Sequence, residues 1–339
     1  MARILARLGL SAAIAGGLFF WLVNQGFHVV PSWEAVRSCT AWWAVPAYAI
    51  IFSAFNWLRA WRWIYLLKPF AKVPAGTMME GAFAGFLAIQ MMPLRTGEVA
   101  RPYLLDRYAG VSKSAVFGTI AIERVVDGLL VSVWLTVALF LIPASRGPHV
   151  WALRLVPLAV FAAAMVLLVA FERSPEWTSR LVARGVGLFS KRLADFTSGV
   201  LERFHKGLGA LPDRRGFWAF SAVSVLYWGL NAVAFDVLAR GCGLDIGLVG
   251  AVAGMGVLAV GILLPSGPGY FGNFQVSLIA ALAMFLPGGA AGSNVEVFIF
   301  LNYVLQTGLT IVFGLGAALS LRRRPVVHRA RIAESAEEV

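Results

Sequence analysis

The chain has 339 residues, of which 59% are hydrophobic and 14% charged, whereas about 25% of the residues in an average soluble protein are charged. The apolar residues gather in nearly uncharged blocks at 8–23, 125–142, 155–171, 216–235 and 297–320. About 20 helical residues are needed to cross about 30 Å of hydrocarbon. This pattern excludes a soluble enzyme, a disordered chain and a small disulfide-stabilised domain. It predicts an all-α, polytopic integral membrane protein.

The net charge of +12 indicates membrane topology and not nucleic-acid binding, because membrane proteins concentrate Lys and Arg on the cytoplasmic side. Full spans are predicted near 8–30, 41–58, 114–142, 151–171, 216–239 and 295–320. Two broken apolar segments, 76–113 and 246–287, are each expected to enter and leave on one side. This assignment puts 24 of the 29 Lys and Arg residues inside and four outside. We therefore expect a multi-pass protein of the inner (cytoplasmic) membrane with both termini cytoplasmic.

The two broken segments open from opposite sides, which is typical of inverted-repeat transporters. The sequence predicts about six full spans plus two opposed broken or re-entrant hairpins, and leaves open whether each hairpin crosses the membrane. Residues 1–320 are predicted to form one transmembrane domain. Within it, 172–215 reads as a basic amphipathic cytoplasmic linker, and 321–339 is expected to be a disordered cytoplasmic tail.

Conventional soluble-enzyme chemistry has no support in the sequence. The four histidines lack metal-ligand spacing and there is no Walker A motif, so no metal and no cofactor are predicted. Cys39 and Cys242 both fall on outer segments, and the sequence does not decide whether they pair.

The first charged segment at membrane depth reads MMPLRTGEVARPYLL. Pro93 removes a backbone donor and Gly97 loosens the chain, so the apolar helix is predicted to break here. At helical spacing, Glu98 and Arg101 share a face and can pair. Arg95 and Arg101 then offer forked donors that suit a phosphate. The alternative is an ordinary cytoplasmic loop with surface ion pairs.

The second segment, AIERVVDGLL, places two carboxylates inside a predicted span. Glu123 and Asp127 are four residues apart and face the same way, with Arg124 beside them. A charge at mid-bilayer costs about 2.5 to 3.5 kcal/mol, so these residues should face the protein interior. We expect them to pair with Arg95, Arg101 or Arg124. The alternatives are a structural ion-pair network and a site where the two carboxylates bind a proton or cation.

The third segment, LLPSGPGYFGNFQ, contains two prolines and three glycines within eight residues and cannot continue a helix. The break is carried by Pro265, Gly267, Pro268, Gly269 and Gly272. We expect it to face a cavity, where free amides beside the next helix N-terminus favour an anion such as phosphate. A plain extracellular turn is the alternative.

In order and separation, the three segments resemble the flippase-like membrane family that includes the transmembrane region of lysylphosphatidylglycerol synthases. Its motifs P-x-R-x-G-E-x-x-R, E-R-x-x-D and P-S-x-P-G-Y-x-G all have counterparts here. The matching residues are Pro93, Arg95, Gly97, Glu98 and Arg101, then Glu123, Arg124 and Asp127, then Pro265, Ser266, Pro268, Gly269, Tyr270 and Gly272. Gln275 stands where the family usually has a glutamate; a neutral amide hydrogen-bonds but carries no proton.

The resemblance covers roughly residues 8–320 and implies translocation of a lipid. The soluble aminoacyl-transfer domain of bifunctional members is expected to be absent, so synthase activity is not expected. The implied substrate is a lipid with an anionic headgroup: an aminoacyl-phospholipid, a polyprenyl-phosphate-linked intermediate or a glycolipid. Expected headgroup contacts are Arg95, Glu98, Arg101, Glu123, Arg124, Asp127, Pro265, Ser266, Gly269, Tyr270 and Gln275.

Two other functions remain compatible with the sequence. One is a non-transporting membrane partner of an envelope glycosyltransferase or lipid synthase, in which the charged motifs are structural. The other is a membrane-embedded lipid-modifying enzyme that uses Glu123 or Asp127 as a general base.

Overall fold

The computed structural model describes residues 2–70, 72–142, 148–174, 177, 214–264, 266–284, 286, 290 and 292–327. All regular secondary structure in these ranges is helical. Most of the predicted linker 172–215 and the end of the predicted tail 321–339 lie outside the described residues, as does Pro265.

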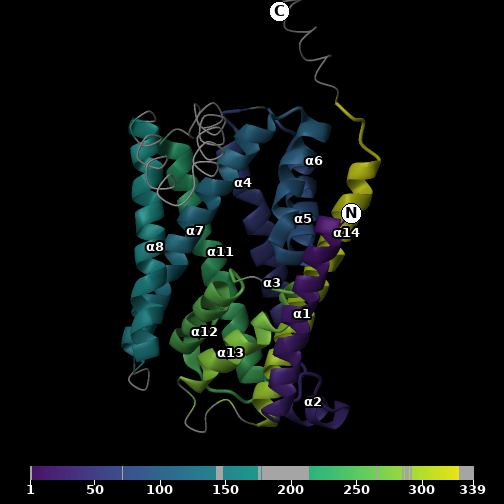
Figure 1. Cartoon of the computed structure of the whole chain (residues 1–339), viewed down its shortest axis with the longest axis vertical. Helices are drawn as coiled ribbons and strands as arrows, with labels where there is room; N and C mark the ends of the chain where they lie inside the picture. The colour runs from purple at the N-terminus through teal and green to yellow at the C-terminus, as the bar shows by residue number, and fades with distance from the viewer. Residues whose placement is uncertain are drawn as a thin grey trace, which may run out of the picture.

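Within the described residues, six long helices form the body of the molecule. They are α1 (Ala2–Asn24), α3 (Ala44–Trp61), α7 (Lys113–Leu141), α8 (Pro148–Arg173), α11 (Arg214–Gly241) and α14 (Ser293–Arg322). Figure 1 shows α7, α8, α11 and α14 running along the long axis. Within the described ranges, four helices are long and apolar enough to span a membrane: α7, α8, α11 and α14. A fifth span is possible if α2 (Trp33–Cys39), α3 and α4 (Trp63–Leu67) act as one segment with an 84° bend.

A first helix pair lies in the upper half of Figure 1 and is formed by α5 (Ala75–Met91) and α6 (Ala100–Ala109). The 3-10 helix η1 (Pro93–Val99) joins them. Because an added Cβ at Gly97 would lie 2.0 Å from the carbonyl oxygen of Ala88, only glycine lets η1 fold back this closely on α5.

A second helix pair lies in the lower half, formed by α12 (Gly247–Gly261) and α13 (Asn273–Ala283). The short 3-10 helix η2 (Pro268–Tyr270) lies between them. Where the tips of the two pairs meet, the Arg95 guanidinium donates a hydrogen bond to the Ile262 carbonyl oxygen at 3.1 Å. The two broken segments thus occupy opposite halves of the molecule, in contact near its middle.

The core is aromatic where α3 packs against α11. Tyr48, Phe52, Phe55 and Tyr227 are buried there, and neighbouring rings have centroids 5.0 to 5.4 Å apart. This packing fixes the end of α3, where two arginines are located.

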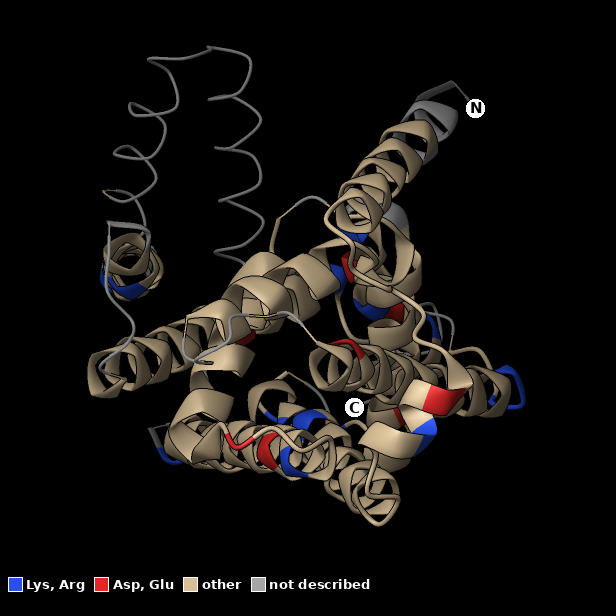
Figure 2. Cartoon of the chain, turned by 90° about the horizontal axis from the view of Figure 1, so that it is seen from below, with Lys and Arg blue, Asp and Glu red and all other residues tan. Residues whose placement is uncertain are grey.

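The outer faces of the long helices are apolar. Val312 of α14 is 65% exposed and Val166 of α8 is 66% exposed, and the view from below shows few charged residues among long uncharged helices (Figure 2). Apolar surface of this extent suits contact with lipid. The chain is a multi-pass membrane protein.

Candidate functional site

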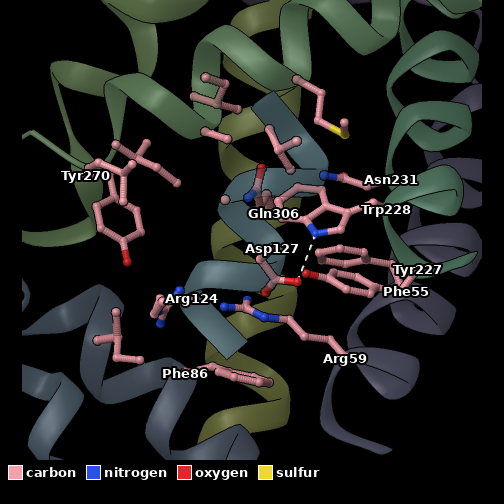
Figure 3. Close-up of a pocket in the computed structure, with 18 of the residues that line it drawn as sticks. Phe55, Arg59, Phe86, Arg124, Asp127, Tyr227, Trp228, Asn231, Tyr270 and Gln306 are labelled. Atoms are coloured by element: carbon pink, nitrogen blue, oxygen red, sulfur yellow. Dashed lines mark hydrogen bonds between the residues drawn. The ribbon is translucent and has the colours of Figure 1, made fainter. Parts of the chain in front are cut away.

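A cavity of about 410 Å³ lies between the tips of the two helix pairs and the helices α3, α7 and α11 (Figure 3). Its volume falls within the range of small-molecule sites. Seven aromatic side chains line it: Phe52, Phe55, Phe86, Phe161, Tyr227, Trp228 and Tyr270. Six side chains with an amide or an aliphatic hydroxyl group also reach it: Asn56, Gln90, Ser132, Asn231, Gln306 and Thr310. The charged lining residues are Arg59, Arg95, Glu98, Arg124 and Asp127.

One group of charges on the cavity wall is loosely held. An oxygen of Glu98 lies 3.4 Å from a terminal nitrogen of Arg95 and 3.4 Å from one of Arg124. Charge-assisted hydrogen bonds are usually 2.7 to 2.9 Å long. The three side chains are 16%, 37% and 27% exposed for Arg95, Glu98 and Arg124. These groups can therefore exchange partners with a ligand.

Arg59 also faces this space. Its guanidinium lies 4.0 Å from the centre of the Phe86 ring. Within the described part of the chain, no carboxylate lies within ion-pair distance of it. Figure 3 shows Arg59 and Arg124 pointing from opposite sides toward the same region below Asp127.

A second group of charges is paired within the protein, and of its members only Asp127 reaches the cavity wall. Both terminal nitrogens of Arg62 donate to the carboxylate oxygens of Asp127, each at 2.6 Å. Arg101 donates to Glu123 at 2.9 Å, and Arg62 lies 3.4 Å from the other oxygen of Glu123. Both arginine side chains are 0% exposed, and the Arg101 guanidinium lies 3.9 Å from the centre of the Trp63 ring. Each carboxylate is thus held by an arginine, and neither is a free general base.

The predicted pairing between Glu98 and Arg101 is wrong. The spacing argument assumes a continuous α-helix, whereas residues 93–99 form a 3-10 helix and α6 begins at Ala100. Glu98 instead contacts Arg95 and Arg124, and Arg101 pairs with Glu123. The expected phosphate contact from Arg101 has no geometric basis, because that side chain is buried behind the cavity wall.

The expectation that the two carboxylates pair inside the protein holds for Glu123, whose partner Arg101 was among the candidates. Asp127 pairs instead with Arg62, which, like Arg59, lies just after the predicted span 41–58. The sequence did contain a signal. These two arginines lie three residues apart in the aromatic stretch FNWLRAWRWIYLL, where a charge at membrane depth needs a partner or a wet cavity.

The third segment reaches the cavity through Tyr270. Its ring centre lies 5.8 Å from the Arg95 guanidinium. Arg95 and Tyr270, with φ of 57° and 59°, are the two non-glycine residues with positive φ in the described ranges. This conformation costs an L-residue about 1 to 2 kcal/mol, and such outliers concentrate at functional sites. Both outliers lie at hairpin tips, and their side chains approach each other at the cavity wall.

The other residues of this segment pack behind the tip. Ser266 is buried, and its carbonyl oxygen accepts a hydrogen bond from the Ser11 hydroxyl at 3.0 Å. Gln275 is buried, and its side-chain oxygen accepts a hydrogen bond from the Gly272 amide at 2.8 Å. That amide at the start of α13 is therefore already occupied.

Three further residues of this segment set its shape. Pro268 begins η2, and Gly269, with φ of 71°, continues it. An added Cβ at Gly267 would lie 2.6 Å from the Cβ of Ala15, so this glycine lets the break pack against α1.

Sequence comparison agrees with the motifs. The model of the family described as "Lysylphosphatidylglycerol synthase TM region" matches residues 4–332. The chain belongs to this family. The resemblance seen in the three motif segments is thereby confirmed for nearly the whole chain.

One curated relative is named "Glycosyltransferase AglD" and comes from Haloferax volcanii. It is 25% identical over 311 residues, which cover 82% of this chain and 49% of that protein. The chain thus spans about half the length of this relative.

Proposed function

We propose that this protein is a lipid flippase or carrier that moves a lipid with an anionic phosphate headgroup across the cytoplasmic membrane, with both chain termini in the cytoplasm. The observation that carries the proposal is the cavity between the tips of two opposed helix pairs, which joins three arginines to an aromatic wall. An aminoacyl-phospholipid, a polyprenyl-phosphate-linked intermediate and a glycolipid are the candidate substrates.

The headgroup binds at the arginines of the cavity wall. Arg59, Arg95 and Arg124 supply planar, forked donors that match the oxygens of a phosphate. Asn56 and Asn231 offer amide donors and acceptors to the hydroxyl groups of a glycerol or a sugar. Arg124 and Arg95 exchange their long contacts with Glu98 for contacts with the phosphate.

The apolar part of the lipid runs along the apolar wall of the cavity. Leu258 and Val260 of α12, Leu263 after it, and Phe161 of α8 line this part. A polar headgroup and the first carbons of its chain can thus be enclosed together, while the rest of the chain stays in the bilayer.

Translocation uses the two helix pairs. Inverted repeats that rock against each other around a central site give access to each membrane side in turn. The contact between the tips, from Arg95 to the Ile262 carbonyl oxygen, breaks when the pairs separate.

The test is transport of a fluorescent phospholipid in proteoliposomes, with external fluorophore quenched by dithionite. Arg95→Gln combined with Arg124→Gln should lower the protein-dependent rate at least about tenfold, because two charged hydrogen-bond donors are lost. Arg240→Gln is the matched control, since Arg240 forms a surface i,i+4 ion pair with Asp236 away from the cavity. A transport rate in the double variant equal to that of the control would refute the assigned roles.

A second candidate is a non-transporting membrane partner of a glycosyltransferase or lipid synthase. The likeness to a protein named as a glycosyltransferase favours it. If this function is correct, the purified protein should move no lipid. The glycosyl-transfer rate of its partner enzyme should rise when the protein is added. Transport by the purified protein alone would exclude this alternative.

A further inference from the structure

The charges around the cavity do not balance. The residues counted are the charged residues that line the cavity and those linked to them by ion pairs. They are Arg59, Arg62, Arg95, Arg101 and Arg124 together with Glu98, Glu123 and Asp127. Five arginines against three carboxylates leave an excess of two positive charges. The remaining polar groups of the cavity wall are amides, hydroxyls, phenols and the indole N–H of Trp228.

The excess lies on the cavity wall and not behind it. The buried arginines are matched by Glu123 and Asp127. On the wall, Arg95 and Arg124 share the single carboxylate of Glu98, and Arg59 has no carboxylate partner in the described residues. Unneutralised charge at membrane depth is costly, so a ligand that brings negative charge is favoured there.

We infer that the cavity takes a phosphate group with two negative charges, either a phosphate monoester or a diphosphate, and that Arg59 sets this preference. The inference rests on the proposed function, because it names the headgroup class for the same cavity. A phosphodiester carries one negative charge and leaves one arginine unneutralised. An aminoacyl-phospholipid adds a positive ammonium group and fits least well.

The geometry suits this role for Arg59. Figure 3 shows Arg59, on α3, and Arg124, on α7, approaching one space from opposite sides, with the Tyr270 hydroxyl on the Arg124 side. The guanidinium of Arg59 is held 4.0 Å from the Phe86 ring centre. Stacking on an aromatic face keeps the N–H edge of a guanidinium free for an acceptor.

Binding is measured separately from transport. The purified protein, in nanodiscs of neutral phosphatidylcholine, is titrated at pH 8 with phosphatidic acid, a monoester, or with phosphatidylglycerol, a diester with the same acyl chains. We expect at least about tenfold tighter binding of the monoester, because it makes one more charged contact. Inorganic phosphate is the third probe. If it binds as tightly as phosphatidic acid, the inference on charge stands but the site serves a free anion.

A change of pH isolates the charge of the ligand. The second pKa of a phosphate monoester is about 6, so phosphatidic acid loses its second charge near pH 5. Its advantage over phosphatidylglycerol should shrink to less than about twofold there. Glu98 from η1, Asp127 from α7 and the cavity arginines face the same space. The diester, which keeps one charge at both pH values, reports any effect of those groups.

The variant Arg59→Gln tests whether Arg59 sets the preference for the monoester. We expect the affinity for phosphatidic acid to fall about tenfold, that for phosphatidylglycerol to stay within about twofold, and Arg59→Lys to retain the preference. Arg240→Gln controls for the loss of a positive charge elsewhere. Equal affinities for the two lipids in the wild type, or a preserved preference in folded Arg59→Gln, would overturn the inference. If Arg59→Gln does not fold, the wild-type pH comparison decides.

The two proposals can fail separately. Monoester preference without lipid transport would leave the headgroup inference intact and remove the flippase function. Transport with equal affinity for the two headgroups would leave the flippase function intact and remove the headgroup inference.

Discussion

Two groups of charged side chains meet at α7, and they are built from the same residue types. In the closed group, Arg62 and Arg101 are fully buried and hold Glu123 and Asp127 at 2.6 to 2.9 Å. In the open group, Arg59, Arg95 and Arg124 have one carboxylate among them, Glu98, whose contacts are 3.4 Å long.

The difference teaches which charges are structural. A buried pair with short, two-pronged contacts has little affinity left for a ligand, and removing one partner leaves an isolated charge. A loose, partly exposed group contributes little to stability. The residue types are alike in the two groups, so burial and distance distinguish them.

The largest effect is expected from Arg62→Ala, which leaves Asp127 without its partner. The free energy of unfolding should fall by about 3 to 5 kcal/mol, because an uncompensated charge remains buried. Thermal unfolding in detergent measures this. Arg124→Ala in the open group is the matched comparison and should cost less than about 1 kcal/mol. Equal melting temperatures for the two variants would erase the distinction between the groups.

The open group depends on the backbone that holds it. Gly97→Ala should lower stability by about 1 to 3 kcal/mol, because the new methyl group meets the Ala88 carbonyl and pushes η1 away from α5. Gly316→Ala on α14 is the control; its added Cβ meets no atom within 4 Å, and alanine is the better helix former by about 1 kcal/mol. Unfolding curves of both variants decide, and equal stability would contradict the tight approach at the tip.

Glu98→Gln sharpens the comparison further. Because Glu98 is 37% exposed and its contacts are long, its loss should change stability by less than about 1 kcal/mol. The positive excess of the cavity rises, so the affinity for phosphatidic acid should increase by about threefold to tenfold. A titration in nanodiscs measures it. A fall in affinity would mean that Glu98 positions the arginines and does not compete with the ligand.

The smallest effect concerns two thiols, one buried and one partly exposed, which differ in the same way as the two groups of charges. Both cysteines are free in the structure. Burial raises the pKa of Cys242, in the turn after α11, to about 12, whereas Cys39 is half-buried. Because the thiolate is the reactive form, Cys242 should stay protonated and unreactive at pH 8, and its reactivity should rise only as the pH approaches 12. Intact mass after brief maleimide treatment at pH 8 should show one adduct, and none in Cys39→Ser; two adducts would contradict burial.

Sequence reasoning reached the helical class, the family and the two opposed helix pairs. Long uncharged blocks and asymmetric Lys and Arg are strong signals in a membrane protein. The interior position of Glu123 followed from the cost of a charge in lipid. These conclusions need only composition and local spacing.

The ion-pair partners of the charged residues could not be predicted from composition and local spacing. Asp127 and Arg62 are 65 residues apart, and their contact depends on how α3 and α7 pack. Arg101 was misassigned because a 3-10 helix shifted its direction relative to Glu98. Arg59 was missed because the predicted span ended at residue 58, at the end of an apolar run, whereas α3 continues to Trp61.

The left-handed backbone at Arg95 and Tyr270 has a consequence for how the hairpin tips are understood. Glycine would occupy either position without the steric cost that a side chain brings. The chain instead carries a guanidinium and a phenol there, facing each other from separate halves of the molecule. These turns therefore hold functional groups in place, and a mutant library that replaces both residues with glycine would relieve the backbone cost while removing a guanidinium and a phenol from the cavity wall.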